Sequence, residues 1–204
     1  MSDAPTPEQS EGDPRSVVLL AVLFEGGLIG LAWLLGWAFD RLPLSTFRWN
    51  WSDAALGALT TLPMLALFFV LVRWPVGPLA RMKKLTDEFI RPLLSPCTVL
   101  DLFGISILAG LGEEMLFRGV LQGAMSDWLQ SPVQGLIIAS VLFGLGHALT
   151  WTYAIFATLM GLYLGWIWQW TGNLMTVALA HALYDFIALL ILVRLMPTSQ
   201  RLNN

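Results

Sequence analysis

Six long runs of apolar residues divide the chain, and short polar stretches separate them. The runs lie at residues 17–39, 54–72, 98–125, 133–149, 153–170 and 174–195. A helix needs roughly 20 apolar residues to cross the hydrocarbon core of a bilayer, and most of the runs are near this length. A spanning segment must also satisfy its backbone polar groups internally, which favours helices. The pattern predicts an all-α, polytopic membrane helical bundle of about six transmembrane helices.

The polar stretches suggest a division of the chain into four parts. Residues 1–14 are acidic and rich in proline, which predicts a disordered N-terminal tail. Residues 15–97 would hold two N-terminal transmembrane helices and an interfacial amphipathic segment, and residues 98–196 a four-helix core followed by a C-terminal tail at 197–204. Several apolar side chains of the amphipathic segment are expected to face lipid. They are Leu79, Met82, Leu85, Phe89 and Ile90.

Composition agrees with a membrane protein and excludes several other classes. The 204 residues are 56% hydrophobic and 12% charged, whereas soluble domains carry about 25% charged residues. The single cysteine, Cys97, rules out an internal disulfide and a multi-cysteine metal site. No large basic patch points to nucleic acid, so membrane lipid and membrane-associated proteins or peptides are the expected partners.

The basic residues predict the orientation. If both termini are cytoplasmic, the cytoplasmic segments hold eight Lys and Arg residues and the outer connections hold two, Arg41 and Arg48. Cytoplasmic loops of membrane proteins carry an excess of Lys and Arg. The count therefore favours an integral protein of the cell (inner) membrane with both the N-terminus and the C-terminus in the cytoplasm.

Three charged residues interrupt the third apolar run. Glu113, Glu114 and Arg118 would each be costly at membrane depth, and such residues usually have a function. Glu114 precedes Arg118 by four residues, which is the favourable order for an ion pair on a helix. Glu113 points about 100° away from Glu114. We therefore expect Glu114 and Arg118 to pair, although such a pair is often purely structural, and Glu113 to face a cavity as a general base.

The two histidines of the chain lie in other apolar runs. His147 is in the fourth, and His181 is in the sixth, one helical turn before Asp185. A histidine near the end of a span can also be a simple interfacial residue, but a bundle can bring both histidines to Glu113, which favours an active site. Glu25, in the first run, is as consistent with helix packing as with a supporting role in that site.

Three short motifs together resemble a known family. They are Glu-Glu-x-x-x-Arg at 113–118, Phe-x-x-x-His at 143–147 and His-x-x-x-Asp at 181–185. In this order and on successive helices, they are similar to the CPBP family, the CAAX-processing and bacteriocin-processing membrane proteases. This family is also called ABI and includes the type II CAAX prenyl endopeptidase. The resemblance covers roughly residues 98–196.

The resemblance implies an intramembrane peptidase and a role for each motif residue. Glu113 and His147 would activate the attacking water, His181 and residue 185 would stabilise the oxyanion, and Glu114 and Arg118 would support the site. The family is described both as metal-dependent and as a glutamate protease without metal. The candidate ligands for Zn²⁺ are Glu113, His147, His181 and Asp185. Both possibilities, Zn²⁺ or no cofactor, stay open at this point.

Position 185 departs from the pattern of many relatives, which have Asn there. An ionised carboxylate has no N–H to donate and would repel an oxyanion. Asp185 could be protonated, orient His181 or ligate a metal, and the i,i+4 spacing favours orientation of His181.

The sequence therefore predicts an intramembrane endopeptidase that hydrolyses a peptide bond of a membrane-associated protein or peptide with water activated by Glu113 and His147. Two alternatives belong to other classes. One is a catalytically silent immunity or scaffold protein of the same fold. The other is a proton-coupled transporter, because buried Glu and His residues also form proton relays.

Overall fold

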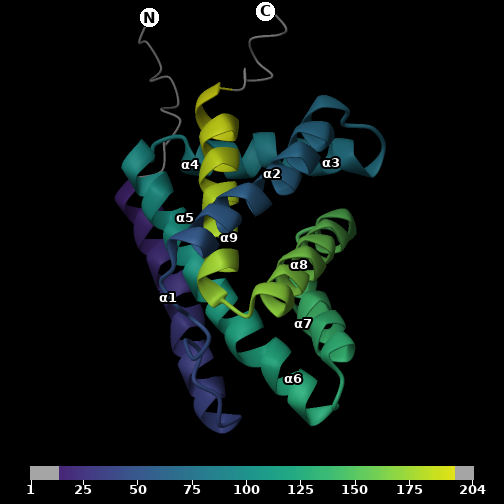
Figure 1. The fold of residues 1–204 in the computed structure, drawn as a ribbon. Helices are drawn as coiled ribbons and strands as arrows, with labels where there is room; N and C mark the ends of the chain where they lie inside the picture. The colour runs from purple at the N-terminus through teal and green to yellow at the C-terminus, as the bar shows by residue number, and fades with distance from the viewer. Residues whose placement is uncertain (1–13, 196–204) are drawn as a thin grey trace, which may run out of the picture.

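The computed structural model describes residues 14–195, and the described part of the chain is helical throughout its regular elements (Figure 1). The N-terminal tail predicted at 1–14 lies outside the described residues except for Pro14, and the C-terminal tail predicted at 197–204 lies wholly outside them. The elements in chain order are α1 (Pro14–Ala38), α2 (Trp51–Arg73), α3 (Pro78–Leu85), η1 (Thr86–Ile90), α4 (Arg91–Leu94), α5 (Val99–Glu114), η2 (Met115–Gln122), α6 (Gly123–Trp128), α7 (Pro132–Gly146), α8 (Trp151–Thr171), α9 (Leu174–Leu190) and η3 (Ile191–Leu195). The segments η1, η2 and η3 are π-helical. The predicted all-α class is confirmed.

Polar residues between the apolar runs fix where the core helices begin. The Thr98 and Asp101 side chains form a capping box at the start of α5. Ser131 and Thr150 cap α7 and α8 by accepting hydrogen bonds from backbone N–H groups of the first turn. Gly172 then ends α8 in the left-handed conformation with φ +60°, which glycine adopts at little cost. The chain can therefore turn at once into α9.

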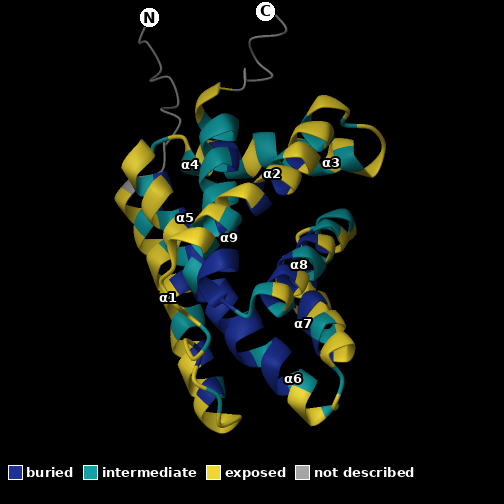
Figure 2. Cartoon of the chain, viewed as in Figure 1, coloured by how far each residue is buried: buried dark blue, intermediate teal, exposed yellow. Residues whose placement is uncertain are grey.

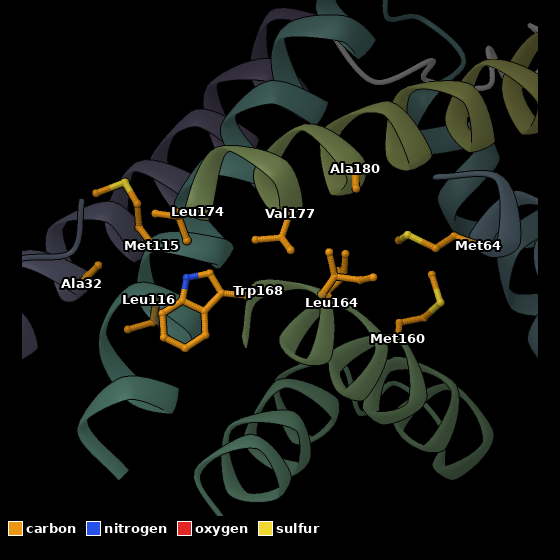
Figure 3. Packing of buried hydrophobic residues seen from close by; sticks show 11 residues of the cluster. Ala32, Met64, Met115, Leu116, Met160, Leu164, Trp168, Leu174, Val177 and Ala180 are labelled. Atoms are coloured by element: carbon orange, nitrogen blue, oxygen red, sulfur yellow. The ribbon is translucent and has the colours of Figure 1, made fainter. Parts of the chain in front are cut away.

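The helices pack as two closely associated pairs, α5 with α9 and α7 with α8, while α1 covers α5 and α2 crosses α9 (Figure 1). A hydrophobic core joins the two pairs. Met115 and Leu116 come from η2, Leu164 and Trp168 from α8, and Val177 from α9 (Figure 3). The core holds the end of α5 against α8 and α9, and the charged residues of α5 lie at this junction.

Burial follows the same arrangement. Buried residues form an almost continuous band along the lower part of α5, η2 and the start of α9, whereas exposed residues dominate the outer faces of α1 and α2 (Figure 2). Many of the exposed residues are large and apolar, such as Leu20, Phe24, Trp37 and Leu59. Large apolar patches on a surface mark a membrane or a partner. The outer surface is thus suited to contact with lipid.

The number of membrane spans differs from the six that the sequence predicts. The described residues contain three helices long and apolar enough to cross a membrane, Arg15–Ala38, Trp51–Arg73 and Leu174–Leu195. There are four if the pair Pro78–Leu94 and Val99–Trp128, bent by 114°, counts as one span. The helix α7 has only 15 residues, fewer than the roughly 20 that a perpendicular span needs. The helix α8 is long enough, but Trp, Tyr and Thr make it less apolar.

The amphipathic segment forms, and most of its apolar face lines a cavity. Leu79, Met82, Leu85 and Ile90 line this cavity of about 300 Å³, and of the five predicted residues only Phe89 is largely exposed. The end of α2, the first turn of α8 and the middle of α9 complete the cavity. The segment α3–η1 is therefore one wall of the cavity.

Candidate active site

The end of α5 places two neighbouring carboxylates in different surroundings. The Glu114 side chain is 0% exposed. Its Oε1 accepts hydrogen bonds from Nη1 of Arg118 at 2.7 Å and from Nδ1 of His181 at 2.8 Å. Arg118 also donates from Nη2 to the carbonyl oxygen of Gly161 at 3.0 Å. The predicted pairing of Glu114 with Arg118 is present, and Glu114 also ties α5 to α9.

His181 lies between two carboxylates. Its Nδ1 contacts Glu114, and its Nε2 lies 3.4 Å from Oδ2 of Asp185, one turn further along α9. A histidine donates from both nitrogens only as the imidazolium. With a carboxylate at each nitrogen, this doubly protonated form suits the arrangement. The predicted i,i+4 contact between His181 and Asp185 is therefore present, and Glu114 is an additional partner that the sequence did not suggest.

His147 and Glu113 face each other from α7 and α5. Nε2 of His147 lies 3.7 Å from Oε2 of Glu113, which is too long for a direct hydrogen bond. Nδ1 of His147 lies 2.8 Å from the carbonyl oxygen of Phe143. Because a carbonyl oxygen only accepts, Nδ1 carries the proton, and Nε2 of the neutral ring presents its lone pair toward Glu113. Among the described residues, Oε2 of Glu113 has no hydrogen-bond partner.

The position of His147 differs from the prediction of a span over residues 133–149. The helix α7 ends at Gly146, and His147 is its C-cap residue with φ −103° and ψ 16°. The early end of α7 places the imidazole at the edge of the bundle, where α7 turns into α8. The ring is 25% exposed, whereas the Glu113 side chain is 8% exposed.

The contacts of Phe143 give a structural reason for a phenylalanine at this position of the second motif. Its ring stacks on His147 with 4.5 Å between ring centroids and lies 6.0 Å from the ring of His181. The guanidinium carbon of Arg118 lies 4.8 Å from the centroid of the Phe143 ring, which is a cation–π distance. One aromatic ring therefore touches Arg118 and both histidines.

Two residues beside the charged groups were not predicted from the sequence, because they carry no charge. Tyr153, in the first turn of α8, lies with its ring 5.8 Å from that of His147 and lines the same cavity as Asp185. Gln122 is fully buried and donates from Nε2 to the carbonyl oxygen of Gly165 at 3.0 Å. The spacing of Arg118 and Gln122 matches that of Gly161 and Gly165, whose carbonyl oxygens they bind. Only this i,i+4 match of polar residues and glycines could have pointed to the contact.

Glu25 reaches the site from α1. It is 9% exposed, and among the described residues its Oε2 has no hydrogen-bond partner. It interacts electrostatically with Glu113, Asp185 and His181. Its own carbonyl oxygen would lie 3.1 Å from a Cβ at position 112, so Gly112 permits the close approach of α1 to α5. This proximity agrees with the supporting role that the sequence left open for Glu25.

The candidate zinc ligands are brought together only as pairs. Glu113 faces His147, and His181 faces Asp185. Within residues 14–195, no group of three or more His, Cys, Asp or Glu side chains is arranged to hold a metal ion. A catalytic zinc site has three protein ligands and an open position. The donor arrangement therefore does not fit such a site, and we derive no reaction step through a metal.

The segment that holds these charged residues is similar to known proteins. Residues 95–187 match the family model described as type II CAAX prenyl endopeptidase Rce1-like. The uncharacterized protein YpbD of Bacillus subtilis (strain 168) is 33% identical over 95 residues, which cover 47% of this chain and 47% of YpbD. The match thus spans about half the length of this curated relative. No solved structure gives a significant match.

The segment matched by the family model contains all six residues of the predicted site. They are Glu113, Glu114, Arg118, His147, His181 and Asp185. Glu25 and the cavity wall from α2 and α3 lie before the matched segment. The resemblance predicted from the three motifs is therefore confirmed over residues 95–187, which are similar to the Rce1-like type II CAAX prenyl endopeptidases.

Proposed function

We propose that the protein is an intramembrane endopeptidase that hydrolyses a peptide bond of a membrane-associated protein or peptide. The observation that carries the proposal is the contrast between the two glutamates. Oε2 of each glutamate lacks a hydrogen-bond partner among the described residues. Oε1 of Glu114, however, pairs with Arg118 and His181, whereas the carboxylate of Glu113 faces Nε2 of His147 at 3.7 Å. A base without a structural partner beside a second basic atom suits the activation of water.

The reaction follows from the positions of these groups. A water between Glu113 and His147 gives a proton to Glu113 while its oxygen forms a bond to the carbonyl carbon of the substrate. The electrons of the carbonyl double bond move to the oxygen, and the imidazolium of His181 stabilises the resulting negative charge. When the C–N bond breaks, the proton held by Glu113 passes to the leaving nitrogen. The products are a carboxyl terminus and a free amine.

His181 and the buried charges have separate roles in this scheme. Glu114 accepts from Nδ1 of His181 and thereby fixes the ring, while Nε2 points toward Asp185, which itself lines the cavity. Arg118 holds Glu114 and is itself fixed by Gly161 and Phe143. Glu114 and Arg118 are therefore positioning residues, and Glu113, His147 and His181 are the proposed catalytic residues.

The surroundings of the site support a substrate that is delivered within or along the membrane. Asp185, Tyr153 and Tyr184 line the 300 Å³ cavity together with apolar residues from α2 and α3. The start of α1 and the end of α9 lie at the same end of the bundle as this cavity (Figure 1). With the orientation expected from the basic residues, the cavity lies toward the cytoplasmic side of the cell (inner) membrane, and both termini are cytoplasmic.

The test is a peptidase assay with purified protein in detergent micelles. The probe is a fluorescence-quenched peptide that ends in a farnesylated Cys-aliphatic-aliphatic-X sequence, with the unprenylated peptide in parallel. We expect Glu113→Gln and His147→Ala each to lower kcat by about 10²- to 10⁴-fold, the usual contribution of general acid–base catalysis. Glu88→Gln, at an exposed position of η1, is the matched control and should retain full activity.

Two further measurements separate this proposal from its alternatives. Metal analysis of the active protein, and assays after chelation and dialysis, show whether the reaction needs an ion. Full activity of both Glu113→Gln and His147→Ala would contradict the catalytic proposal. A wild-type protein that cleaves nothing, in the assay and in a comparison of membrane-protein termini between wild-type and deletion strains, would favour a silent scaffold. Proton flux in proteoliposomes that requires Glu113 would favour a transporter.

A further inference from the structure

The proposed reaction leaves the oxyanion with one identified donor. His181 supplies an N–H, but Asp185 offers only acceptor oxygens as a carboxylate. An oxyanion is normally stabilised by more than one donor placed before the reaction begins. A second donor should therefore lie near His147 and Asp185 and face the cavity.

We propose that Tyr153 is a further catalytic residue, whose phenolic O–H donates a hydrogen bond to the oxyanion in place of the amide that Asp185 lacks. This inference rests on the proposed function. Tyr153 lines the cavity together with Asp185, and its ring meets that of His147 edge-on with 5.8 Å between centroids. Asp185 and Glu113 both act electrostatically on its hydroxyl.

The backbone around Tyr153 holds the residue in place while its hydroxyl stays uncommitted. Thr150 caps α8 by accepting a hydrogen bond from the backbone N–H of Tyr153 at 3.1 Å. The cap ties the start of α8 to the turn that follows His147. Within residues 14–195, the Tyr153 hydroxyl makes no hydrogen bond to the protein, although the side chain is partly buried. A partly buried tyrosine usually finds a partner for its hydroxyl, and a substrate oxygen in the cavity would be one.

Two other tyrosines show why Tyr153 is the better donor. Tyr184 also lines the cavity, but its ring packs against Phe68 with 6.4 Å between centroids, whereas the ring of Tyr153 meets His147. Tyr163 donates its hydroxyl to the carbonyl oxygen of Thr60 at 2.9 Å and joins α8 to α2. Tyr184 is therefore a neighbour of the site, and Tyr163 is structural.

The chemical role of Tyr153 is hydrogen bonding without proton transfer. As water adds to the carbonyl carbon, the carbonyl oxygen becomes negative and accepts a charge-assisted hydrogen bond from the phenol. The phenol keeps its proton. When the C–N bond breaks, the carbonyl double bond forms again, the hydrogen bond weakens, and Glu113 returns the proton of the water to the leaving nitrogen.

The test compares Tyr153→Phe with Tyr184→Phe and Tyr163→Phe, using the same farnesylated peptide. Each change removes one hydroxyl and keeps the ring. We expect Tyr153→Phe to lower kcat by about 10²-fold or more, the effect of losing one oxyanion donor, with KM and the melting temperature little changed. Tyr184→Phe should stay within about threefold of wild type. Tyr163→Phe should lower the melting temperature, since it removes a hydrogen bond between helices.

The double variant Tyr153→Phe/Asp185→Asn separates a catalytic role from a structural one. The new amide at position 185 can donate to the same oxyanion, so kcat should recover by about tenfold relative to Tyr153→Phe, as expected for partial replacement of a donor. If Tyr153→Phe is as active as wild type while Glu113→Gln is inactive, this inference is overturned and the proposed function stands. A raised KM with unchanged kcat, or a fall in kcat that Asp185→Asn does not relieve, also overturns it. If Glu113→Gln is active, the proposed function and this inference fail together.

Discussion

Two regions of the molecule carry ion pairs at the same helical spacing, next to a π-helical segment, in opposite environments. At the junction of α5 and η2, Glu114 and Arg118 are 2.7 Å apart, with side chains 0% and 2% exposed. On α3 and η1, Lys84 and Glu88 are 3.7 Å apart, with side chains 71% and 52% exposed. The spacing along the chain is i,i+4 in both, whereas the surroundings and the order of acid and base differ.

The difference lies in how completely each charge is compensated. Around the buried pair, His181, the carbonyl of Gly161 and the ring of Phe143 all contribute contacts. The exposed pair is solvated and screened by salt. Removing one partner of a buried ion pair leaves an uncompensated buried charge, which is strongly destabilising. The buried pair is thus an integral part of the bundle, although Oε2 of Glu114 has no hydrogen-bond partner among the described residues, and the exposed pair is replaceable.

The largest expected effect is on folding and comes from breaking the buried pair. Glu114→Ala leaves Arg118 and His181 without their shared carboxylate, and we expect the free energy of unfolding to fall by about 3–5 kcal/mol. The measurement is unfolding of the purified protein in mixed detergent micelles. The neighbouring Glu113→Ala is the matched control. It removes a buried carboxylate but leaves the pairs of Arg118 and His181 with Glu114 intact, so it should change stability far less while abolishing activity.

A Glu114→Ala protein as stable as wild type would contradict this comparison, because the buried pair would then behave like the exposed one. The double change Glu114→Gln/Arg118→Met sharpens the result. It removes both opposite charges and keeps the approximate volumes, and it should be more stable than Glu114→Ala because no cation is left without its carboxylate.

The next largest expected effect comes from replacing an aromatic ring that covers a charge, compared with replacing an aromatic ring on the exposed surface. Phe143→Leu removes the ring above Arg118 and beside both histidines, and it should lower the free energy of unfolding by about 2 kcal/mol. Activity should also fall, because His147 loses the surface on which it stacks. Phe89→Leu, on the exposed face of η1, is the control and should change neither the free energy of unfolding nor the activity. Equal effects of the two changes would show that the Phe143 ring serves only as apolar filling.

The fold and the residues of the site were largely readable from sequence, for a physical reason. Apolar runs long enough to span a membrane predict helices, and the charges within them must be buried against one another. The segment 113–118 and the two histidines were therefore identified without coordinates. The pairing of Glu114 with His181 was not, because 67 residues separate them and the sequence offered the closer Asp185 as the partner.

Other features depend on what lies beside a helix. Amphipathicity shows that Leu79, Met82 and Leu85 share an apolar face, but it does not show that this face lines a cavity. The length of an apolar run likewise does not show where a helix ends, and α7 stops at Gly146. Tyr153 carries no charge at neutral pH, so a search for ionisable groups in the membrane does not find it.

The smallest expected effect concerns the exposed pair. Lys84→Ala removes one partner of an i,i+4 pair in solvent, and the free energy of unfolding should change by no more than about 0.5 kcal/mol. High salt should erase even this difference, because screening weakens the pair in the wild type as well. The measurement is unfolding in nonionic micelles at low and at high salt, with Arg118→Ala in parallel as the buried counterpart, whose loss of stability should persist at high salt. A change above about 1 kcal/mol for Lys84→Ala that survives high salt would mean that the wall of the cavity depends on this lysine in a way that its exposure does not indicate.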